Sequence, residues 1–491
     1  MRIRSLLLAA SFAFCTPFAA PALASPWAEV GDNQLRSDIE ILAAAGVIDG
    51  ITIHWPLPWR SLVSALGRAS LDRQPQAVRL AAERVLAHAR AGTAPGLRAS
   101  AFADATNLPA TVYGFDGMGR GKGEAQLSLE NTGSVFSGRI SLGAITQDFR
   151  GKSFKLMPEG TYFSADLGGT LVYGGYLDHW WGPGEISALS LSNNARPMPQ
   201  IGIERSSTQA SSWPVLKWLG PWQLEFLLAY MDGPRIQPDT YYDGLRFTFN
   251  PAPGLEIGLA RTEMFCGQAH SCSPIRDYFD LRNDPAHPDK TNDQGVIDVK
   301  YSNVLGGMPF QVYMQVMNED SSPFTSSGTS HLFGASIFLP TGANPFKVTA
   351  EYTDSITTQD MFSFGRNYYG FSYTNGTYPD GMRYRGRTLG FSLDDDSTLL
   401  SLQGSWTDKG GRFYELSLHH AAIGTSHTPA GANILSTTPI HLNLAEARVS
   451  LPVNLGGEGI RVDLDGRVQD DQLRPARGAT AAVEVALHIG L

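Results

Sequence analysis

Residues able to bind a hydroxyl-rich ligand are concentrated in one stretch of this chain. Trp180 and Trp181 are followed by Gly-Pro-Gly at 182–184 and by the sequence NNARP at 193–197. Tryptophan and tyrosine rings offer flat apolar faces to the C–H surfaces of sugars, and asparagine, aspartate and arginine form directed hydrogen bonds. Such a set could recognise sugar hydroxyls or the carboxylate of an acidic sugar. The same residues could instead pack inside the protein, with Gly-Pro-Gly in a tight turn.

A second stretch of the same chemistry is the tyrosine-rich GRNYYGFSYTNGTY at 365–378. It combines a cationic side chain with several aromatic rings, as expected for a surface loop that binds an acidic polymer. The candidate ligand-binding residues from both stretches are Asp178, Trp180, Trp181, Asn193, Asn194, Arg196, Arg366, Tyr368, Tyr369 and Tyr373.

The pair Asp178-His179 raises the possibility of a hydrolase. Adjacent residues on a strand point to opposite faces, so these two side chains cannot readily share one site. The sequence contains no G-x-S-x-G, no zinc motif and no phosphate-binding glycine loop. We therefore expect no enzymatic activity, no cofactor and no metal.

Two cysteines, Cys266 and Cys272, remain once an N-terminal leader is removed. Zinc binding by this pair with His270 lacks a second ligand pair nearby. In an oxidising compartment the two thiols are expected to form a disulfide that closes a short loop.

That compartment is indicated by the N-terminus. Arg2 and Arg4 precede the apolar run LLLAASFAF, and Ala22-Leu23-Ala24 supplies a small-residue cleavage site. Residues 1–24 are therefore predicted to be a signal peptide. Lipid attachment at Cys15 is disfavoured because Phe14 stands where a small residue is normally needed. The net charge of -9 argues against a nucleic-acid partner.

Residues 25–96 show helical periodicity. Apolar residues recur at spacings of three and four in DNQLRSDIEILAAAGVID, PLPWRSLVSALGRA and QPQAVRLAAERVLAHARAG. We expect a small helical bundle that packs against the rest of the protein.

From residue 97 to residue 491 the period falls to two. In FKVTAEYT at 346–353 and IRVDLD at 460–465, apolar side chains alternate with charged or polar ones. A soluble sandwich would also alternate, but the strands recur along nearly the whole remaining chain, with aromatic residues at their ends. The pattern predicts an all-β transmembrane β-barrel of about 18 antiparallel strands, with charged residues inside and apolar residues toward lipid.

The long connections 264–293, 318–330 and 421–442 are expected at one end of the barrel, if one extra strand lies within 354–381. Short turns such as NVLGG and PTGAN then lie at the other end. The phase of the strands within 165–222 is not fixed by the pattern.

The combination of LVYGGYLDHWWGPG with LSLSNNARPMPQIGIERS resembles the signature of the Wzi-like capsule-assembly proteins of Gram-negative outer membranes. The resemblance implies an eighteen-stranded barrel with a periplasmic helical bundle. It also implies a monomeric lectin whose surface-exposed loops hold capsular or other surface polysaccharide and assist capsule assembly. The alternative is a porin or carbohydrate-selective channel, because a barrel of this size can enclose an aqueous lumen.

Overall fold

The computed structural model describes residues 26–148, 155–268, 272, 291–319, 328–341, 344–363, 367–425, 433–455, 458–473 and 478–490. The expected signal peptide (residues 1–24), Arg366 and His270 lie outside these residues. The remaining predicted site residues are all described.

Three α-helices precede the long strands: α1 (Asn33–Ala44), α2 (Trp59–Arg68) and α3 (Gln76–Gly92). Asp32 caps α1 by accepting a hydrogen bond of 2.9 Å from the amide of Leu35, and a proline precedes each of α2 and α3. The helices bury their apolar stripes in a common core, as the periodicity predicted. A short 3₁₀ helix, η1 (Lys217–Leu219), lies farther along the chain. No described helix is long and apolar enough to cross a membrane.

The strands before residue 200 are β1 (Trp27–Ala28), β2 (His54–Trp55), β3 (Leu57–Pro58), β4 (Gly96–Thr106), β5 (Gly121–Thr132), β6 (Phe136–Asp148), β7 (Lys155–Met157), β8 (Tyr162–Asp166), β9 (Thr170–Gly175) and β10 (Trp180–Trp181). Those from residue 200 to 368 are β11 (Gln200–Arg205), β12 (Trp222–Tyr230), β13 (Thr240–Ala252), β14 (Leu255–Cys266), β15 (Asn292–Leu305), β16 (Met308–Glu319), β17 (Thr329–Thr341), β18 (Asn344–Thr358) and β19 (Asn367–Tyr368). The last are β20 (Arg383–Tyr384), β21 (Arg387–Thr388), β22 (Thr398–Thr407), β23 (Phe413–Ile423), β24 (Ile440–Leu455), β25 (Glu458–Asp471) and β26 (Ala479–Gly490).

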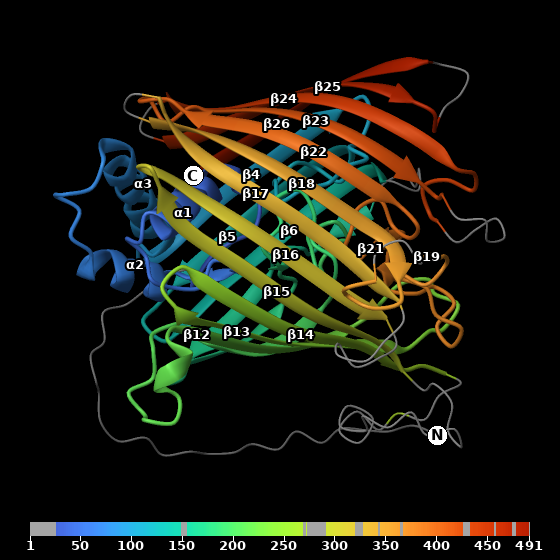
Figure 1. The fold of residues 1–491 in the computed structure, drawn as a ribbon, viewed down its shortest axis with the longest axis horizontal. Coiled ribbons are helices and arrows are strands. Elements are labelled where there is room, and N and C mark those ends of the chain that lie inside the picture. The colour runs from blue at the N-terminus through green and yellow to red at the C-terminus, as the bar shows by residue number, and fades with distance from the viewer. Residues whose placement is uncertain are drawn as a thin grey trace.

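The long strands form one closed antiparallel barrel (Figure 1). The ring closes where β26 pairs with β4, from Glu484 opposite Thr106 to Gly490 opposite Ser100. Since β6 pairs directly with β8 and β18 directly with β22, β7 and β19 are short additions to the ring. Within the described residues, eighteen strands therefore circle the barrel, which confirms the predicted closed barrel of about 18 strands.

The two faces of the strands divide as their alternation predicted. On β18, Phe346 and Tyr352 are exposed on the outside, whereas Lys347 and Glu351 are buried inside. Outward leucines such as Leu402 are half exposed, and charged residues from several strands pair in the interior. The outer surface is thus an apolar band, and the lumen is polar.

The connections differ in length between the two ends of the barrel. The helices lie at one end, called here the helix end, together with short turns such as 253–254 and 306–307. Strands β14, β16, β18 and β23 finish at the opposite end, called here the loop end, where the described residues 370–397 also lie (Figure 1). Large parts of the connections 264–293, 318–330 and 421–442 lie outside the described residues.

Within 354–381 the described residues form only the two-residue β19, which pairs with the end of β18 and does not cross the barrel. The expected extra crossing is therefore wrong. The strands β14, β16 and β23 nevertheless all finish at the loop end, so the three long connections leave from one end, as expected.

The lumen is filled from both ends. The helical segment, residues 26–95, enters from the helix end, where Lys347 of β18 lies 2.5 Å from Glu40 of α1. Three connections fold inward from the loop end and are called here the inward segments: residues 107–120, 176–199 and 370–397. Their side chains pack with inward-facing strand residues in a continuous core.

Candidate functional site

The tryptophan pair lies where an inward segment meets the helical segment. Trp180 pairs with Trp55 across the small sheet β10–β2, and both tryptophans of the motif are fully buried. Arg36 of α1 donates hydrogen bonds to the carbonyls of Pro183 and Gly184, at 3.1 and 2.7 Å. The double tryptophan and the turn after it therefore join an inward segment to the helical segment. The helical segment and the inward segments, which together fill the lumen, are called here the plug.

The glycines of this turn are required by their surroundings. Gly182 has a φ of 144°, a conformation that side chains with a Cβ rarely adopt. A Cβ on Gly184 would collide with the carbonyl oxygen of Ser187. The Gly-Pro-Gly sequence is thus explained by packing alone.

The two asparagines connect the inward segments to one another. Asn193 donates to the carbonyl oxygen of Asp116 at 2.9 Å, and Asn194 donates to that of Thr388 at 2.9 Å. Both side chains are buried. Each asparagine amide thereby links residues 176–199 to a backbone carbonyl of another inward segment.

Two other predicted site residues are also buried. Arg196 forms an ion pair with Glu159, and Tyr373 donates a hydrogen bond of 2.5 Å to the carbonyl of Leu189. The side chains of Trp180, Trp181, Asn193, Asn194, Arg196 and Tyr373 thus lie inside the plug, where a polymer outside the barrel does not reach them.

Asp178, Tyr368 and Tyr369 are the described candidates that reach the surface. The side chain of Asp178 is 33% exposed, Tyr368 is 38% exposed, and Tyr369 is partly exposed. Tyr368 belongs to β19, beside the end of β18, and packs edge-on against Phe371. The structure therefore does not bring all the predicted residues together at one surface.

Partly exposed charged residues gather around Asp178 at the loop end. Arg120 donates to Asp178 at 2.9 Å, and Arg385 donates to Asp232 at 2.7 Å. Glu159 lies within electrostatic range of both arginines. We call Arg120, Glu159, Tyr176, Asp178, Asp232 and Arg385 the loop-end cluster.

The loop-end cluster can form several kinds of polar contact. The arginine side chains are 16% and 22% exposed, and each keeps donors beyond those that its carboxylate occupies. The Arg120 guanidinium lies 5.9 Å from the centroid of the Tyr113 ring, and the Arg385 guanidinium lies 5.2 Å from that of the Tyr384 ring, so an aromatic ring helps to hold each cation in place. Burial raises the pKa of Glu159, and Arg196 opposes that rise.

Sequence reasoning did not single out Arg120 or Arg385. They are distant in sequence from the tryptophan motif and meet it only because residues 107–120 and 370–397 fold into the lumen. The one available signal was a basic residue flanked by glycine in GRGKG at 119–123 and YRGR at 384–387. That signal is too common to identify a site.

Asp178 and His179 lie in different environments. Asp178 pairs with Arg120, whereas Nδ1 of His179 lies 3.6 Å from Glu225 in the buried interior. This separation agrees with the expectation that the two side chains do not share a site. Across the described part of the chain, no group of three or more His, Cys, Asp and Glu residues is arranged to hold a metal ion.

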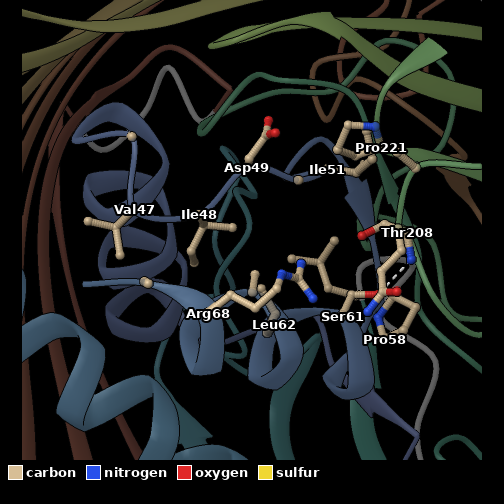
Figure 2. Close-up of a pocket in the computed structure, with 17 residues that line it drawn as sticks. Val47, Ile48, Asp49, Ile51, Pro58, Ser61, Leu62, Arg68, Thr208 and Pro221 are labelled. Atoms are coloured by element: carbon tan, nitrogen blue, oxygen red, sulfur yellow. Dashed lines mark hydrogen bonds between the residues drawn. The ribbon is translucent and has the colours of Figure 1, made fainter. Parts of the chain in front are cut away.

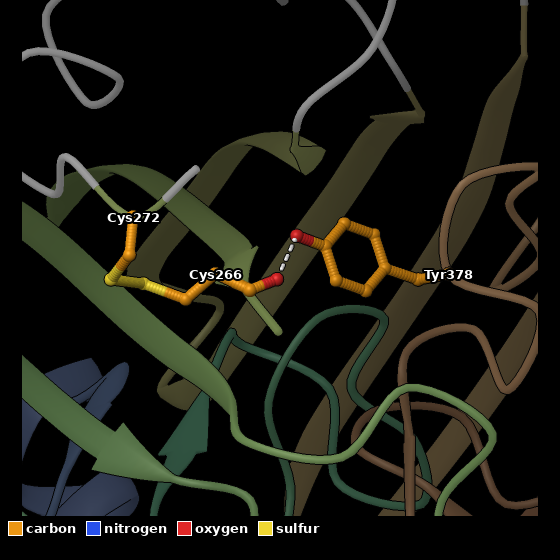
Figure 3. The surroundings of a disulfide bond; sticks show 3 residues. All are labelled: Cys266, Cys272 and Tyr378. Carbon is orange, nitrogen blue, oxygen red and sulfur yellow. Dashed lines mark hydrogen bonds between the residues drawn. A yellow bond between two sulfur atoms is a disulfide. The ribbon is translucent and has the colours of Figure 1, made fainter. Parts of the chain in front are cut away.

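Cys266 and Cys272 are joined by a disulfide at the loop end (Figure 3). The carbonyl oxygen of Cys266 accepts a hydrogen bond of 2.8 Å from the Tyr378 hydroxyl. Tyr378 belongs to the inward segment 370–397. The disulfide loop is therefore attached to the plug.

A cavity of about 570 Å³ lies at the helix end, between the helical segment and the connection 206–221 that joins β11 to β12 (Figure 2). Its lining is largely aliphatic, with Arg68 and Asp49 as the charged groups and a hydrogen bond of 2.8 Å between Thr208 and Ser61. It contains no aromatic ring on which a sugar could stack. The loop-end cluster is therefore the better candidate for a carbohydrate.

Comparison with known proteins identifies the family to which the chain belongs. Residues 95–470 match the family model described as capsule assembly protein Wzi. A protein of Klebsiella pneumoniae, described as an uncharacterized 55.8 kDa protein in the cps region, is 26% identical over 309 residues, which are 62% of this chain. The match spans 60% of that relative's length.

One solved structure is similar over nearly the whole chain. It is the Escherichia coli outer membrane protein Wzi, described as involved in group 1 capsule assembly and as a carbohydrate-binding β-barrel. The TM-score is 0.79 at 21% identity, and the match covers 94% of this chain and 98% of that one. At this identity the likeness shows a shared fold.

Proposed function

The chain belongs to the family of capsule assembly proteins described as Wzi, and from this membership we propose that it binds a capsular or other surface polysaccharide. In this proposal the barrel spans the outer membrane with the loop end outside and the helix end in the periplasm. The protein acts as a monomeric lectin that holds polymer at the cell surface and so assists capsule assembly.

The loop-end cluster is the observation that carries the proposal. Its two arginines and the carboxylates of Asp178 and Asp232 are partly exposed, so they can exchange some of their mutual contacts for hydroxyl or carboxylate groups of a sugar. They are also held by buried contacts to the plug, such as the hydrogen bond of 3.1 Å from Arg120 to the carbonyl of Asn193. A rigid polar surface loses little conformational entropy on binding.

The motif at 180–197 has a supporting role in this proposal. Its tryptophans and asparagines fix the inward segments against one another and against the helical segment. They position the loop-end cluster without touching the ligand. Tyr368 of β19 and the adjacent Tyr369 add a partly exposed aromatic surface beside the end of β18.

The filled lumen argues against the alternative of a sugar-conducting channel. The inward segments meet the helical segment directly, as the pairing of Trp180 with Trp55 demonstrates. An open path would require at least one of these parts to move aside.

The test uses two pairs of substitutions and one matched control. Arg120→Ala with Arg385→Ala removes the exposed cations of the loop-end cluster, and Tyr368→Ala with Tyr369→Ala removes the aromatic edge. The control, Arg60→Ala with Arg412→Ala, removes two exposed arginines at the helix end. Binding of the purified variants to a glycan array, and the ratio of cell-bound to shed capsule, are the measurements.

The arginine pair is expected to weaken polymer binding about tenfold or more, because a lost charge-assisted bond costs about 1–3 kcal/mol. The control pair should bind like the parent chain, and every variant should retain the heat-modifiable gel migration of a closed barrel. Loss of binding only in the tyrosine pair would indicate that the polysaccharide contacts Tyr368 and Tyr369 and not the arginines. Unchanged binding in both loop-end pairs would overturn the assignment of the site.

A further inference from the structure

One connection at the helix end departs from the short turns beside it. Residues 206–221 join β11 to β12, whereas the turns at 167–169 and 253–254 contain two or three residues. This connection, called here the tryptophan loop, contains Trp213, Val215 and Trp218, which are 59%, 59% and 64% exposed. Three large apolar side chains within six residues form a patch that water solvates poorly.

The patch is continuous with the outer surface of the barrel. Trp218 packs edge-on against Phe249 with ring centroids 6.0 Å apart, and Phe249 stacks on Phe247 at 5.3 Å. Both phenylalanines face outward on β13, because the alternate residues Arg246 and Thr248 are fully buried inside. In Figure 1 the loop that carries η1 projects beyond the wall beside β12, away from the lumen.

Cationic side chains accompany the aromatic rings. Lys217 is exposed between the two apolar parts of the loop, and the Arg205 guanidinium lies 3.9 Å from the centroid of the Trp222 ring. Tryptophan beside lysine or arginine is the combination that membrane interfaces favour, since indole rings lie at the headgroup level and the cations meet phosphate.

The other side of the tryptophan loop holds the helical segment. The amide of Thr208 donates to the Ser61 hydroxyl at 2.8 Å, and Gln209 donates to the Ser64 hydroxyl at 2.6 Å. Both serines belong to α2. The loop therefore lies between α2 and the outer face of the barrel.

We propose that the tryptophan loop is an interfacial membrane anchor, whose Trp213, Val215 and Trp218 enter the headgroup region of the leaflet at the helix end. Its occupant is a lipid surface, because the patch continues the apolar band of the barrel and carries cations suited to phosphate. Through Ser61 and Ser64 the anchor fixes α2 beside the membrane. The inference rests on the membrane placement in the proposed function.

The experiment uses the full mature chain, with its native disulfide intact, reconstituted into vesicles of phosphatidylethanolamine and phosphatidylglycerol. Single cysteines at three positions are labelled with one fluorophore: Val215→Cys in the loop, Leu402→Cys on the outer wall, and Lys409→Cys in an exposed turn at the helix end. Quenching by lipids with brominated acyl chains is compared with quenching by aqueous iodide.

The label at position 215 should be quenched by brominated lipid, and iodide should quench it less than half as well as the label at 409. If position 402 is quenched by lipid but 215 behaves like 409, the anchor is overturned while the membrane placement stands. That outcome would leave the patch free for a periplasmic protein. If position 402 also escapes lipid quenching, the membrane placement fails, and the anchor fails with it.

Discussion

Trp181 illustrates how one residue type can serve recognition or packing. Its ring is fully buried in the core formed by the inward segments and the strands, 6.0 Å from the rings of both His54 and His179. The sequence identified the residue as special but could not separate the two roles, because both require a large aromatic side chain beside glycine. Burial, which depends on where segments distant in sequence fold, decides between them.

We predict that Trp181→Ala destabilises the plug by about 3–5 kcal/mol, because deleting a buried indole leaves a cavity that its neighbours fill only in part. Differential scanning calorimetry of the detergent-solubilised chain measures the loss. Trp181→Phe, which retains most of the apolar volume, should cost less. A Trp181→Ala protein as stable as its parent would show that the ring lies elsewhere.

His54 provides a pH-dependent contact between the helical segment and the barrel. Burial lowers its pKa from 6.5 to about 4, although Glu225, at 2.9 Å from Nε2, opposes the shift. Between pH 6.5 and pH 4, His54 is protonated in the unfolded chain but neutral in the folded chain. Its contribution to the free energy of unfolding is therefore fully present above pH 6.5 and is lost as the pH falls toward 4. The loss should be on the order of 3 kcal/mol.

Thermal unfolding at pH 7.5 and pH 4.5 tests this expectation. In His54→Gln, which cannot titrate, the difference in unfolding free energy between the two pH values should shrink. The control His88→Gln removes a histidine whose side chain is 39% exposed and should retain the parent's pH dependence. An equal pH dependence in parent and His54→Gln would contradict the prediction.

At the scale of elements, the strands were predictable and the inward segments were not. Alternation identifies a strand with one polar and one apolar face, as on β18 and β25, because the barrel imposes the same environment along the whole strand. Residues 370–397 have no such period and form short turns and the two-residue strands β20 and β21. Their contacts with the rest of the plug, such as Tyr373 with Leu189 and Tyr378 with Cys266, join residues remote in sequence. Local pattern does not encode contacts of that kind.

The candidate site was predictable only in part for the same reason. The sequence located Asp178, Tyr368 and Tyr369, which reach the surface, but grouped them with residues that the fold buries. The arginines that complete the loop-end cluster come from two other inward segments. Their meeting follows from the closed barrel, which forces long connections into one confined lumen.

The disulfide between Cys266 and Cys272 closes one short loop after β14. We predict that mass spectrometry without reductant finds Cys266 linked to Cys272. The paired Cys266→Ser and Cys272→Ser variant should lose roughly 2 kcal/mol of stability by chain-entropy reasoning, confined to the loop end. Deuterium exchange should therefore rise in β14 near the disulfide and in the segment around Tyr378, and remain unchanged in α1. Two free thiols in the protein isolated without reductant would contradict the predicted disulfide.

At the scale of the whole molecule, a barrel of eighteen strands is wide enough to conduct, but its lumen is occupied. The helical segment and the inward segments are connected to the strands by ion pairs and hydrogen bonds, such as Lys347 with Glu40 and Gln315 with the carbonyl of Trp181. We predict that the mature chain in a planar bilayer shows no steady single-channel conductance. An open porin reconstituted in the same way is the positive control, and stable conductance steps from the mature chain would favour the channel function.

The parts that fill the lumen differ in how the chain holds them. Each inward segment is continuous at both ends with neighbouring strands, for example 176–199 with β9 and β11, which pair with each other. In the described chain, the helical segment continues into the barrel through one covalent connection, from α3 into β4. A mechanical force that pulls toward the helix end would therefore detach the helical segment as one piece, breaking its side-chain contacts and the short β2–β10 pairing while every strand of the barrel stays paired. The same force on an inward segment would have to separate paired barrel strands, because the segment is covalently continuous with the wall at both ends. The helical segment is therefore mechanically weaker in its attachment than the inward segments.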